Sequence, residues 1–309
     1  MITTVEQAAK SNGEFLAGGT DYMDRLRHHL ASGNSVDLNY IAGLNRIEIE
    51  GGKTYIGAMT TMFNVAQAPH LRENYAGLAE AAGGLATPQI RQIGTIGGNL
   101  TQATRCQYYR HHHLECQKKG DTNCGGRVGY HPFGVVFDNG GCVAPHPSTL
   151  GMALYAYDAE VEINDSEVRP ITALYGDGSD YDRDHLLGKN EIITKIILPA
   201  TEKGEKAAYF RSIARARAEW ALVECTVRLQ LDGGTINQAF VAVGGVAAVP
   251  MRLSKVEAAL VGQPATEDSF AEASELAADG VNPLPQTGYK VPLLVNTVEE
   301  TLLRAMGLV

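Results

Sequence analysis

The segment Gly94-Thr95-Ile96-Gly97-Gly98-Asn99 places two adjacent glycines between a hydroxyl residue and an asparagine. A related run, Gly18-Gly19-Thr20-Asp21, follows a short strand predicted over 14–17 and precedes a helix predicted over 22–30. Glycine allows a sharp turn, and the first amides of a helix point outward with the helix dipole behind them. Each run is therefore interpreted either as an anion-binding turn or as a loop that only turns the chain. Together, the two runs predict a diphosphate held from both sides.

Several other signatures are absent. Neither glycine run contains G-x-G-x-x-G, so a nicotinamide-type Rossmann domain is not expected. No G-x-S-x-G elbow or H-E-x-x-H helix supports a hydrolase. The acidic run over 177–184 lacks the central glycine and distal glutamate of an EF-hand loop, and it predicts a solvated linker instead of a calcium site.

Four of the five cysteines, Cys106, Cys116, Cys124 and Cys142, follow the second glycine run at separations of nine, seven and seventeen residues. Four thiolates complete the ligand set of a cubane iron–sulfur cluster, and a long polar loop needs a tether. Zinc and four unligated thiols are the alternatives; closed zinc sites usually show closely spaced cysteine pairs. The adjacent histidines 111–113 are expected on a solvated surface, and Cys225 in an apolar core.

Length and charge limit the protein class. At 309 residues the chain is long enough for two domains, and its net charge of −9 disfavours nucleic acid as a partner. No apolar run approaches the ~18 residues of a membrane span, and the N-terminus lacks the pattern of a signal peptide. The chain is therefore expected to be cytoplasmic and without a membrane span, unless it is exported together with a partner that carries a signal.

The pattern of turns predicts where the elements lie. Glycine turns at 51–52 and 233–234 predict two β-hairpins, and helices are expected over 75–82, 150–157 and 297–306. The polar stretch 175–189 is the expected boundary between domains. We expect an α+β fold divided into residues 1–176 (in two parts, about 1–54 and 55–176, with the cysteine loop at 104–143), a connecting segment 177–198, and residues 199–309.

The glycine runs also resemble a known family. Residues 15–21 and 87–100 resemble the two flavin-binding loops in the FAD subunit of the molybdenum hydroxylases, the xanthine dehydrogenase family. Further similarity is found at 56–61, 146–148 and 243–252, so it covers nearly the whole chain. Thr149 and Ser212 stand where members often carry aspartate and lysine.

This resemblance implies a two-part FAD-binding domain of the PCMH type, as in the CO dehydrogenase flavoprotein, followed by a smaller α+β domain. It implies FAD as cofactor, and partners that carry molybdopterin and two [2Fe–2S] clusters. The residues implied to bind FAD, with Arg105 as a further phosphate contact, are Glu14, Phe15, Leu16, Ala17, Gly18, Gly19, Thr20, Asp21, Tyr22, Thr95, Ile96, Gly97, Gly98, Asn99 and Arg105.

The cysteine loop resembles that of a subset of the family. Residues 104–109 and 142–148 resemble the entry and exit of the loop that carries a [4Fe–4S] cluster in periplasmic aldehyde oxidoreductases and 4-hydroxybenzoyl-CoA reductase, the former more closely. The expected function is electron transfer from [2Fe–2S] centres of a partner to FAD and on to an acceptor such as ferredoxin, with no catalytic residue on this chain. The alternatives are a self-contained flavoprotein oxidase or reductase and a zinc-stapled assembly subunit.

Overall fold

This computed structural model describes residues 1–309, and its first sheet is a parallel pair of strands near the N-terminus. Helix α1 (Val5–Ala9) precedes β1 (Glu14–Leu16), and α2 (Tyr22–Arg27) connects β1 to β2 (Ser35–Asp37). Helix α2 is shorter than the predicted 22–30. His29 has a φ of 58°, and the N–H of Leu30 bonds to the carbonyl of Arg25, which ends the helix.

A five-stranded antiparallel sheet follows, with strand order β3-β4-β7-β5-β6. Its strands are β3 (Ile47–Glu50), β4 (Lys53–Gly57), β5 (Glu160–Ile163), β6 (Glu167–Pro170) and β7 (Ile193–Leu198). The β3–β4 hairpin turns at Gly51 and Gly52, whose φ values of 57° and 80° favour glycine. Strand β7 enters the middle of this sheet, so residues 193–198 pack with the first part of the chain.

Helices cover this sheet and form the larger core with it. They are α3 (Met62–Gln67), α4 (Pro69–Asn74), α5 (Ala76–Gly84), α6 (Pro88–Ile93), α7 (Ile96–Leu100), α10 (Thr149–Ala156) and the 3₁₀ turn η2 (Ile171–Leu174). Every residue of α10 is buried, as expected for a helix that is apolar on all sides. Helices α3 and α7 begin at Thr61 and Thr95, whose hydroxyls accept a hydrogen bond from an amide of the first turn.

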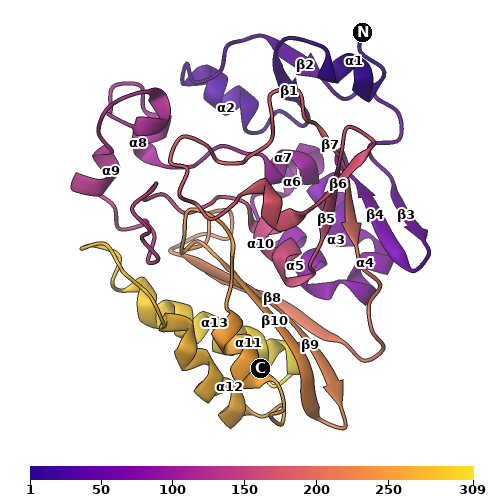
Figure 1. Cartoon of the computed structure of the whole chain (residues 1–309), viewed down its shortest axis with the longest axis vertical. Helices are drawn as coiled ribbons and strands as arrows, with labels where there is room; N and C mark the ends of the chain where they lie inside the picture. Colours follow the sequence, from indigo (N-terminus) through magenta and orange to yellow (C-terminus); the bar gives the residue numbers. More distant parts are fainter.

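The C-terminal part is a four-stranded antiparallel sheet of order β11-β10-β9-β8, seen in the lower part of Figure 1. Its elements are β8 (Lys206–Ser212), β9 (Val223–Asp232), β10 (Thr235–Gly244), β11 (Met251–Arg252), α11 (Ser254–Leu260), α12 (Glu267–Ser274), η3 (Glu275–Ala278) and α13 (Lys290–Met306). Helices α11 and α13 pack on one face, with α12 against these two helices, and α5 and α10 pack on the other face. Residues 223–229 are accordingly buried on both sides of β9.

The cysteine segment, defined as residues 104–143, lies at one side of the molecule between these two parts (Figure 1). It contains only short helical turns: α8 (Gln107–Arg110), η1 (Gln117–Lys119) and α9 (Gly125–Val128). No helix of the structure has the length and apolar character needed to cross a membrane. The expected domain limits at 176 and 198 stay predictions.

Candidate functional site

The two glycine motifs lie in direct contact. A Cβ placed on Gly18 would be 1.9 Å from the carbonyl oxygen of Ile93 and 3.1 Å from the Cα of Gly94. Glycine at position 18 therefore allows the first turn to pack against the backbone that leads into the second motif. The two motifs thus pack against each other, and their holding a diphosphate from both sides stays a prediction.

The first motif leaves its backbone amides free. Residues 17–21 connect β1 to α2, and none of their N–H groups donates a hydrogen bond within the protein. Gly19 has a φ of 74°, which L side chains rarely adopt. Backbone amides are almost always paired with protein, water or ligand, and successive unpaired amides form a concavity that binds anions. This turn therefore has the donors that an anionic ligand requires.

The second motif uses its amides internally, because it is the helix α7 and not a loop. Thr95 Oγ1 accepts a hydrogen bond from the N–H of Gly98 at 3.1 Å. The N–H groups of Ile96 and Gly97 donate to carbonyls of the β4–α3 connection at 2.9 and 2.8 Å. A Cβ on Gly97 would lie 2.9 Å from the carbonyl oxygen of Ala58. The glycines of this motif thus permit close packing, and the protein itself takes up the amides of residues 96–98, the first three of α7.

Both motifs line one cavity of about 610 Å³, the glycine cleft. The predicted residues that line it are Glu14, Phe15, Ala17, Gly18, Gly19, Thr20, Asp21, Tyr22, Thr95, Gly97 and Gly98. Leu16 is absent from this lining, Ile96 is fully buried in the core, and Asn99 and Arg105 line an adjoining cavity. Residues 187–189 also line the cleft, so part of the stretch expected to be a linker forms a wall of the site.

Ion pairs hold the first motif in place. Asp21 pairs with Arg25, Arg105 and Arg110 at 3.0, 2.9 and 2.7 Å, and Arg25 also pairs with Glu14 at 2.6 Å. Burial acts to raise the pKa of Asp21, but the guanidinium groups of Arg105 and Arg110 keep that pKa below its ordinary value. Asp21 therefore stays ionised and ties the turn to the start of the cysteine segment.

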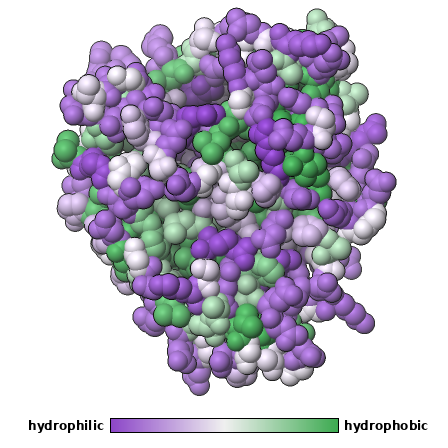
Figure 2. All heavy atoms as spheres, viewed as in Figure 1, coloured by the Kyte–Doolittle hydropathy of each residue, from purple (hydrophilic) through white to green (hydrophobic).

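Two further cavities extend the cleft. A narrow cavity of about 110 Å³, the middle cavity, shares Thr20, Asp21, Thr95, Gly98 and Gln102 with the glycine cleft. It also shares Arg105, Pro147, Glu219 and Trp220 with a third cavity of about 650 Å³. The third, the interdomain cavity, lies between the cysteine segment and the C-terminal sheet. Figure 2 shows apolar patches around the hollow between the two lobes of an otherwise mostly hydrophilic face.

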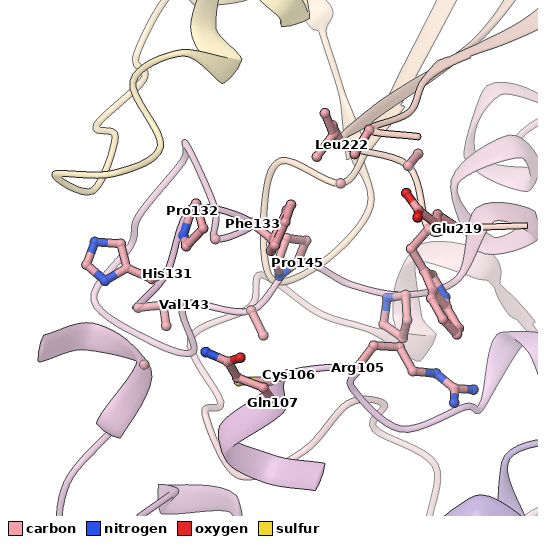
Figure 3. A pocket seen from close by; sticks show the side chains of 18 of the residues that line it. Arg105, Cys106, Gln107, His131, Pro132, Phe133, Val143, Pro145, Glu219 and Leu222 are labelled. Carbon is pink, nitrogen blue, oxygen red and sulfur yellow. The ribbon is translucent and has the colours of Figure 1, made fainter. Parts of the chain in front are cut away.

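Arg105 stands where the middle and interdomain cavities meet. Its guanidinium lies 4.8 Å from the ring centre of Trp220 and donates to Gln102 Oε1 at 2.9 Å. Its Nε is buried and has no hydrogen-bond partner. In Figure 3, Arg105 and Glu219 lie on one side of the interdomain cavity, and His131 and Pro132 lie on the other. Contact between Arg105 and a flavin phosphate stays a prediction.

The structure brings the four cysteine thiols of the cysteine segment into one neighbourhood. Burial raises the pKa of Cys106, and the nearby thiol of Cys124 raises it further. Burial raises the pKa of Cys142 to about 12, with Cys106 adding to the effect. Nearby backbone groups act against this rise and lower the pKa of three thiols: Tyr108 and Tyr109 for Cys106, Lys118 for Cys116, and Ala144 for Cys142.

The thiols do not, however, converge on a single point. The structure contains no group of three or more histidine, cysteine, aspartate or glutamate side chains that could hold one metal ion. The predicted four-cysteine cluster is therefore not confirmed by the side-chain positions. The same geometry disfavours zinc, since zinc needs all its ligands at about 2.0–2.3 Å from one centre.

The segment is anchored to the rest of the molecule by charge. Lys118, whose side chain is 4% exposed, pairs with Asp184 at 3.1 Å. Arg110 likewise pairs with Asp24 at 2.8 Å, whereas the pair of Arg127 with Asp138 at 2.7 Å lies within the segment. The expectation that the whole acidic run 177–184 is solvated is thus wrong for Asp184, which is largely buried against the cysteine segment.

The remaining candidates lie mostly as the sequence suggested. His111, His112 and His113 are exposed, with the rings of the first two stacked at 5.5 Å. Cys225 is fully buried in the core of the C-terminal part. His131 is buried with both ring nitrogens unpartnered.

One feature of the site had no sequence signal. Thr149 donates to the buried carboxyl group of Glu224 on β9 at 2.9 Å, and Thr149 stands where members of the family often carry aspartate. Because the two residues are 75 positions apart, no local pattern indicates the contact.

Comparisons with known proteins agree with this geometry. Residues 2–201 match the model of the FAD binding domain in molybdopterin dehydrogenase, and residues 208–305 match that of the CO dehydrogenase flavoprotein C-terminal domain. The gap between the matches falls in the β7–β8 connection. The chain is 30% identical to the aldehyde oxidoreductase FAD-binding subunit PaoB of Escherichia coli (strain K12), over 98% of this chain and 96% of that protein.

More distant relatives have the same architecture. The carbon monoxide dehydrogenase medium chain of Hydrogenophaga pseudoflava is 26% identical over 86% of this chain and 78% of its own length. A structure of the carbon monoxide dehydrogenase of that organism, lacking the Mo-pyranopterin moiety of the molybdenum cofactor, superimposes with a TM-score of 0.76 at 23% identity. The superposition covers 99% of this chain and 96% of the carbon monoxide dehydrogenase chain. The expected fold class is confirmed.

Proposed function

Because the chain belongs to the FAD-binding subunits of the molybdenum hydroxylase and CO dehydrogenase family, we propose that it is an electron-transfer subunit carrying FAD and a [4Fe–4S] cluster. Its complex would be a molybdopterin-dependent enzyme similar to aldehyde oxidoreductase. Electrons would pass from [2Fe–2S] clusters of a partner subunit to this chain and then to an external acceptor such as ferredoxin. The observation that carries the flavin site is the row of unpaired amides over 17–21.

The diphosphate of FAD is assigned to this row of amides. The amides lie in the glycine cleft, which is also lined by Thr20, whose hydroxyl is a further donor, and by Lys189. Hydrogen bonds from neutral backbone donors to a charged acceptor are about twice as strong as neutral pairs. Asp21, which is held by three arginines, lies at the end of the row where the middle cavity begins.

The flavin ring is assigned to the far end of the groove. The middle cavity shares lining residues with the glycine cleft and with the interdomain cavity. An extended dinucleotide can therefore run from the glycine cleft through the middle cavity into the interdomain cavity. Arg105 and Trp220 offer a donor and an aromatic face at that end. When bound, the flavin exchanges one or two electrons and so matches one-electron clusters to a two-electron acceptor. The chain's part is to orient the flavin and to tune it electrostatically.

The cluster proposal rests on the chemistry of the donors. Thiolates are the ligands of iron–sulfur clusters, and hydrogen bonds to the sulfurs tune their potentials. The backbone groups that lower the pKa of Cys106, Cys116 and Cys142 fit that role.

The partners follow from the names of the relatives. Those relatives are subunits or medium chains of larger enzymes, among them an aldehyde oxidoreductase and a carbon monoxide dehydrogenase. We therefore propose a molybdopterin-binding large subunit and a [2Fe–2S] small subunit as partners of this chain. The substrate would then react in the large subunit, and no acid–base pair of this chain would act on it.

The test is analysis of protein purified anaerobically with its copurifying subunits, after which this chain is isolated and its content measured. We expect FAD, iron and acid-labile sulfide near ~1:4:4, the content of one cubane. Cys106→Ser should lose iron and sulfide while keeping FAD. Cys225→Ser, which changes a buried cysteine of the C-terminal core, is the matched control and should keep both.

Each other outcome points to a different function. Zinc without sulfide would indicate that the chain is an assembly subunit held together by zinc and that it carries no iron–sulfur cluster. Turnover of a substrate by the isolated chain would indicate a self-contained flavoprotein oxidase or reductase instead of an electron-transfer subunit. Absence of FAD from protein that is folded and complexed would overturn the flavin assignment.

A further inference from the structure

Glu224 is a buried carboxyl without an ion pair. It lies on β9 with 4% of its surface exposed, and its Oε2 accepts hydrogen bonds from Thr149 Oγ1 and Tyr209 Oη, both at 2.9 Å. Arg211, the cation whose charge acts on Glu224, directs its guanidinium to the carbonyls of Arg217 and Glu219. An isolated charge here would be costly, since burial disfavours ionised carboxyls unless an opposite charge balances them.

The second oxygen of Glu224 is available to a ligand. Oε1 has no hydrogen-bond partner in the protein, yet it is not among the polar atoms sealed from solvent. It lies beside Gly244, where a Cβ would be only 2.7 Å away, so glycine leaves room for it. Glu224 lines the interdomain cavity together with Arg105 and Trp220. Oε1 is therefore the oxygen that a ligand in this cavity can approach.

The two hydroxyl donors determine where a proton resides. Because Oε2 already accepts two hydroxyl hydrogens, the proton of the neutral carboxyl is placed on Oε1. Burial raises the pKa of Glu224, while the hydroxyls of Thr149 and Tyr209 and the charge of Arg211 oppose that rise. The other charged groups that line the cavity, Arg105, Arg215 and Glu219, form no ion pair with Glu224. In its neutral form the acid can donate from Oε1, and solvent in the cavity can restore the proton.

We propose that Glu224 is the proton-exchanging group of the flavin site, donating from Oε1 to a ring nitrogen of the flavin when the flavin is reduced. This inference rests on the proposed function. Reduction consumes two electrons, supplied by the iron–sulfur donors of the partner subunit, and two protons. One proton comes from Glu224, whose O–H bond breaks as an N–H bond forms, and the other comes from water. The resulting carboxylate regains a proton from water in the interdomain cavity.

The test is redox-difference infrared spectroscopy of the FAD-loaded complex, comparing oxidised and reduced states in H₂O and D₂O. The wild-type protein should show a C=O band of a protonated carboxylic acid that changes on reduction and shifts in D₂O. Glu224→Gln should lose this band. Glu80→Gln is the matched control, because Glu80 is also a partly buried carboxyl bonded to Tyr209, through its backbone N–H, but lines none of the three cavities; it should keep the band.

A second variant and a second measurement keep the test valid if Glu224→Gln disturbs folding. Thr149→Val removes one donor to Oε2 and should shift the band without abolishing it. Flavin reduction at neutral pH should slow by about 10²-fold in Glu224→Gln, since a positioned acid contributes at least that factor. A wild-type spectrum without the band, or a band that persists in Glu224→Gln, overturns this inference alone. Failure of the wild-type protein to hold FAD overturns the proposed function instead.

Discussion

The two glycine motifs have nearly the same composition and opposite structural roles. In the first, residues 17–21 leave their amides unpaired, and Gly18 packs against the backbone before the second motif. In the second, Thr95 and the β4–α3 connection take up the first amides of α7, and Gly97 packs against Ala58. Paired glycines therefore do not by themselves indicate a phosphate site. What distinguishes the two motifs is whether the protein satisfies the backbone donors.

Gly18→Ala should give the largest effect, because the added Cβ would lie 1.9 Å from the carbonyl oxygen of Ile93. Relieving this clash requires a shift of the backbone, which costs more than a shift of a side chain. We expect a loss of about 3 kcal/mol or more in the free energy of unfolding, measured by urea titration, together with loss of bound FAD. Gly83→Ala is the control, since its Cβ would make an ordinary 3.5 Å contact. Equal stability of the two variants would show that the motifs are not packed as described.

Asp21→Asn tests the charges that hold the first motif. Loss of the carboxylate removes the ion pairs that Asp21 forms with Arg25, Arg105 and Arg110. We expect the free energy of unfolding to fall by about 2 kcal/mol at neutral pH. The pKa of Asp21 is lowered in the folded state, so its contribution is present above its ordinary pKa near 3.8 and disappears as the pH falls through the lowered value. Unfolding measured from pH 7 downward should thus bring the variant and the wild type together in acid, and a constant difference would argue against this role.

Gly98→Leu separates binding from folding in the second motif. Gly98 lines the glycine cleft and the middle cavity, and its nearest neighbours would be Thr95 Oγ1 at 3.0 Å and Ala17 at 3.9 Å. A leucine in α7 should keep the fold and obstruct the groove, weakening FAD binding at least tenfold, or about 1.4 kcal/mol. Isothermal titration of apoprotein with FAD measures this, and unchanged affinity would place the dinucleotide outside the groove.

Thr95→Ala should have the smallest effect. It removes the hydroxyl that caps α7, which costs about 1 kcal/mol of stability. Thr95→Ser keeps the hydroxyl and should retain most of that stability in thermal unfolding. If the hydroxyl binds phosphate directly, Thr95→Ala would instead lose more FAD affinity than stability, and Thr95→Ser would keep both.

Local patterns predicted local structure well. The hairpin turns at Gly51–Gly52 and Gly233–Gly234 are found where the glycines indicated, because such turns depend on a few adjacent residues. The first glycine motif was recognised as a turn for the same reason. Helix α7 was missed, since a five-residue helix with two glycines has low intrinsic propensity and forms because Thr95 and its tertiary contacts stabilise it.

Long-range contacts could not be predicted. The packing of Gly18 on Ile93, the contact of Asp184 with Lys118 and the approach of Glu224 to Thr149 each join residues more than 60 positions apart. The sequence likewise placed the four cysteines in one segment but did not determine whether their sulfurs meet, because separations of up to seventeen residues allow many loop conformations.

The most direct test of the central claim is a crystal structure of the FAD-loaded protein. The account predicts diphosphate oxygens within hydrogen-bonding distance of the N–H groups of residues 17–21, and no phosphate at the start of α7. A diphosphate bound elsewhere, with those N–H groups bonded only to water, would contradict it.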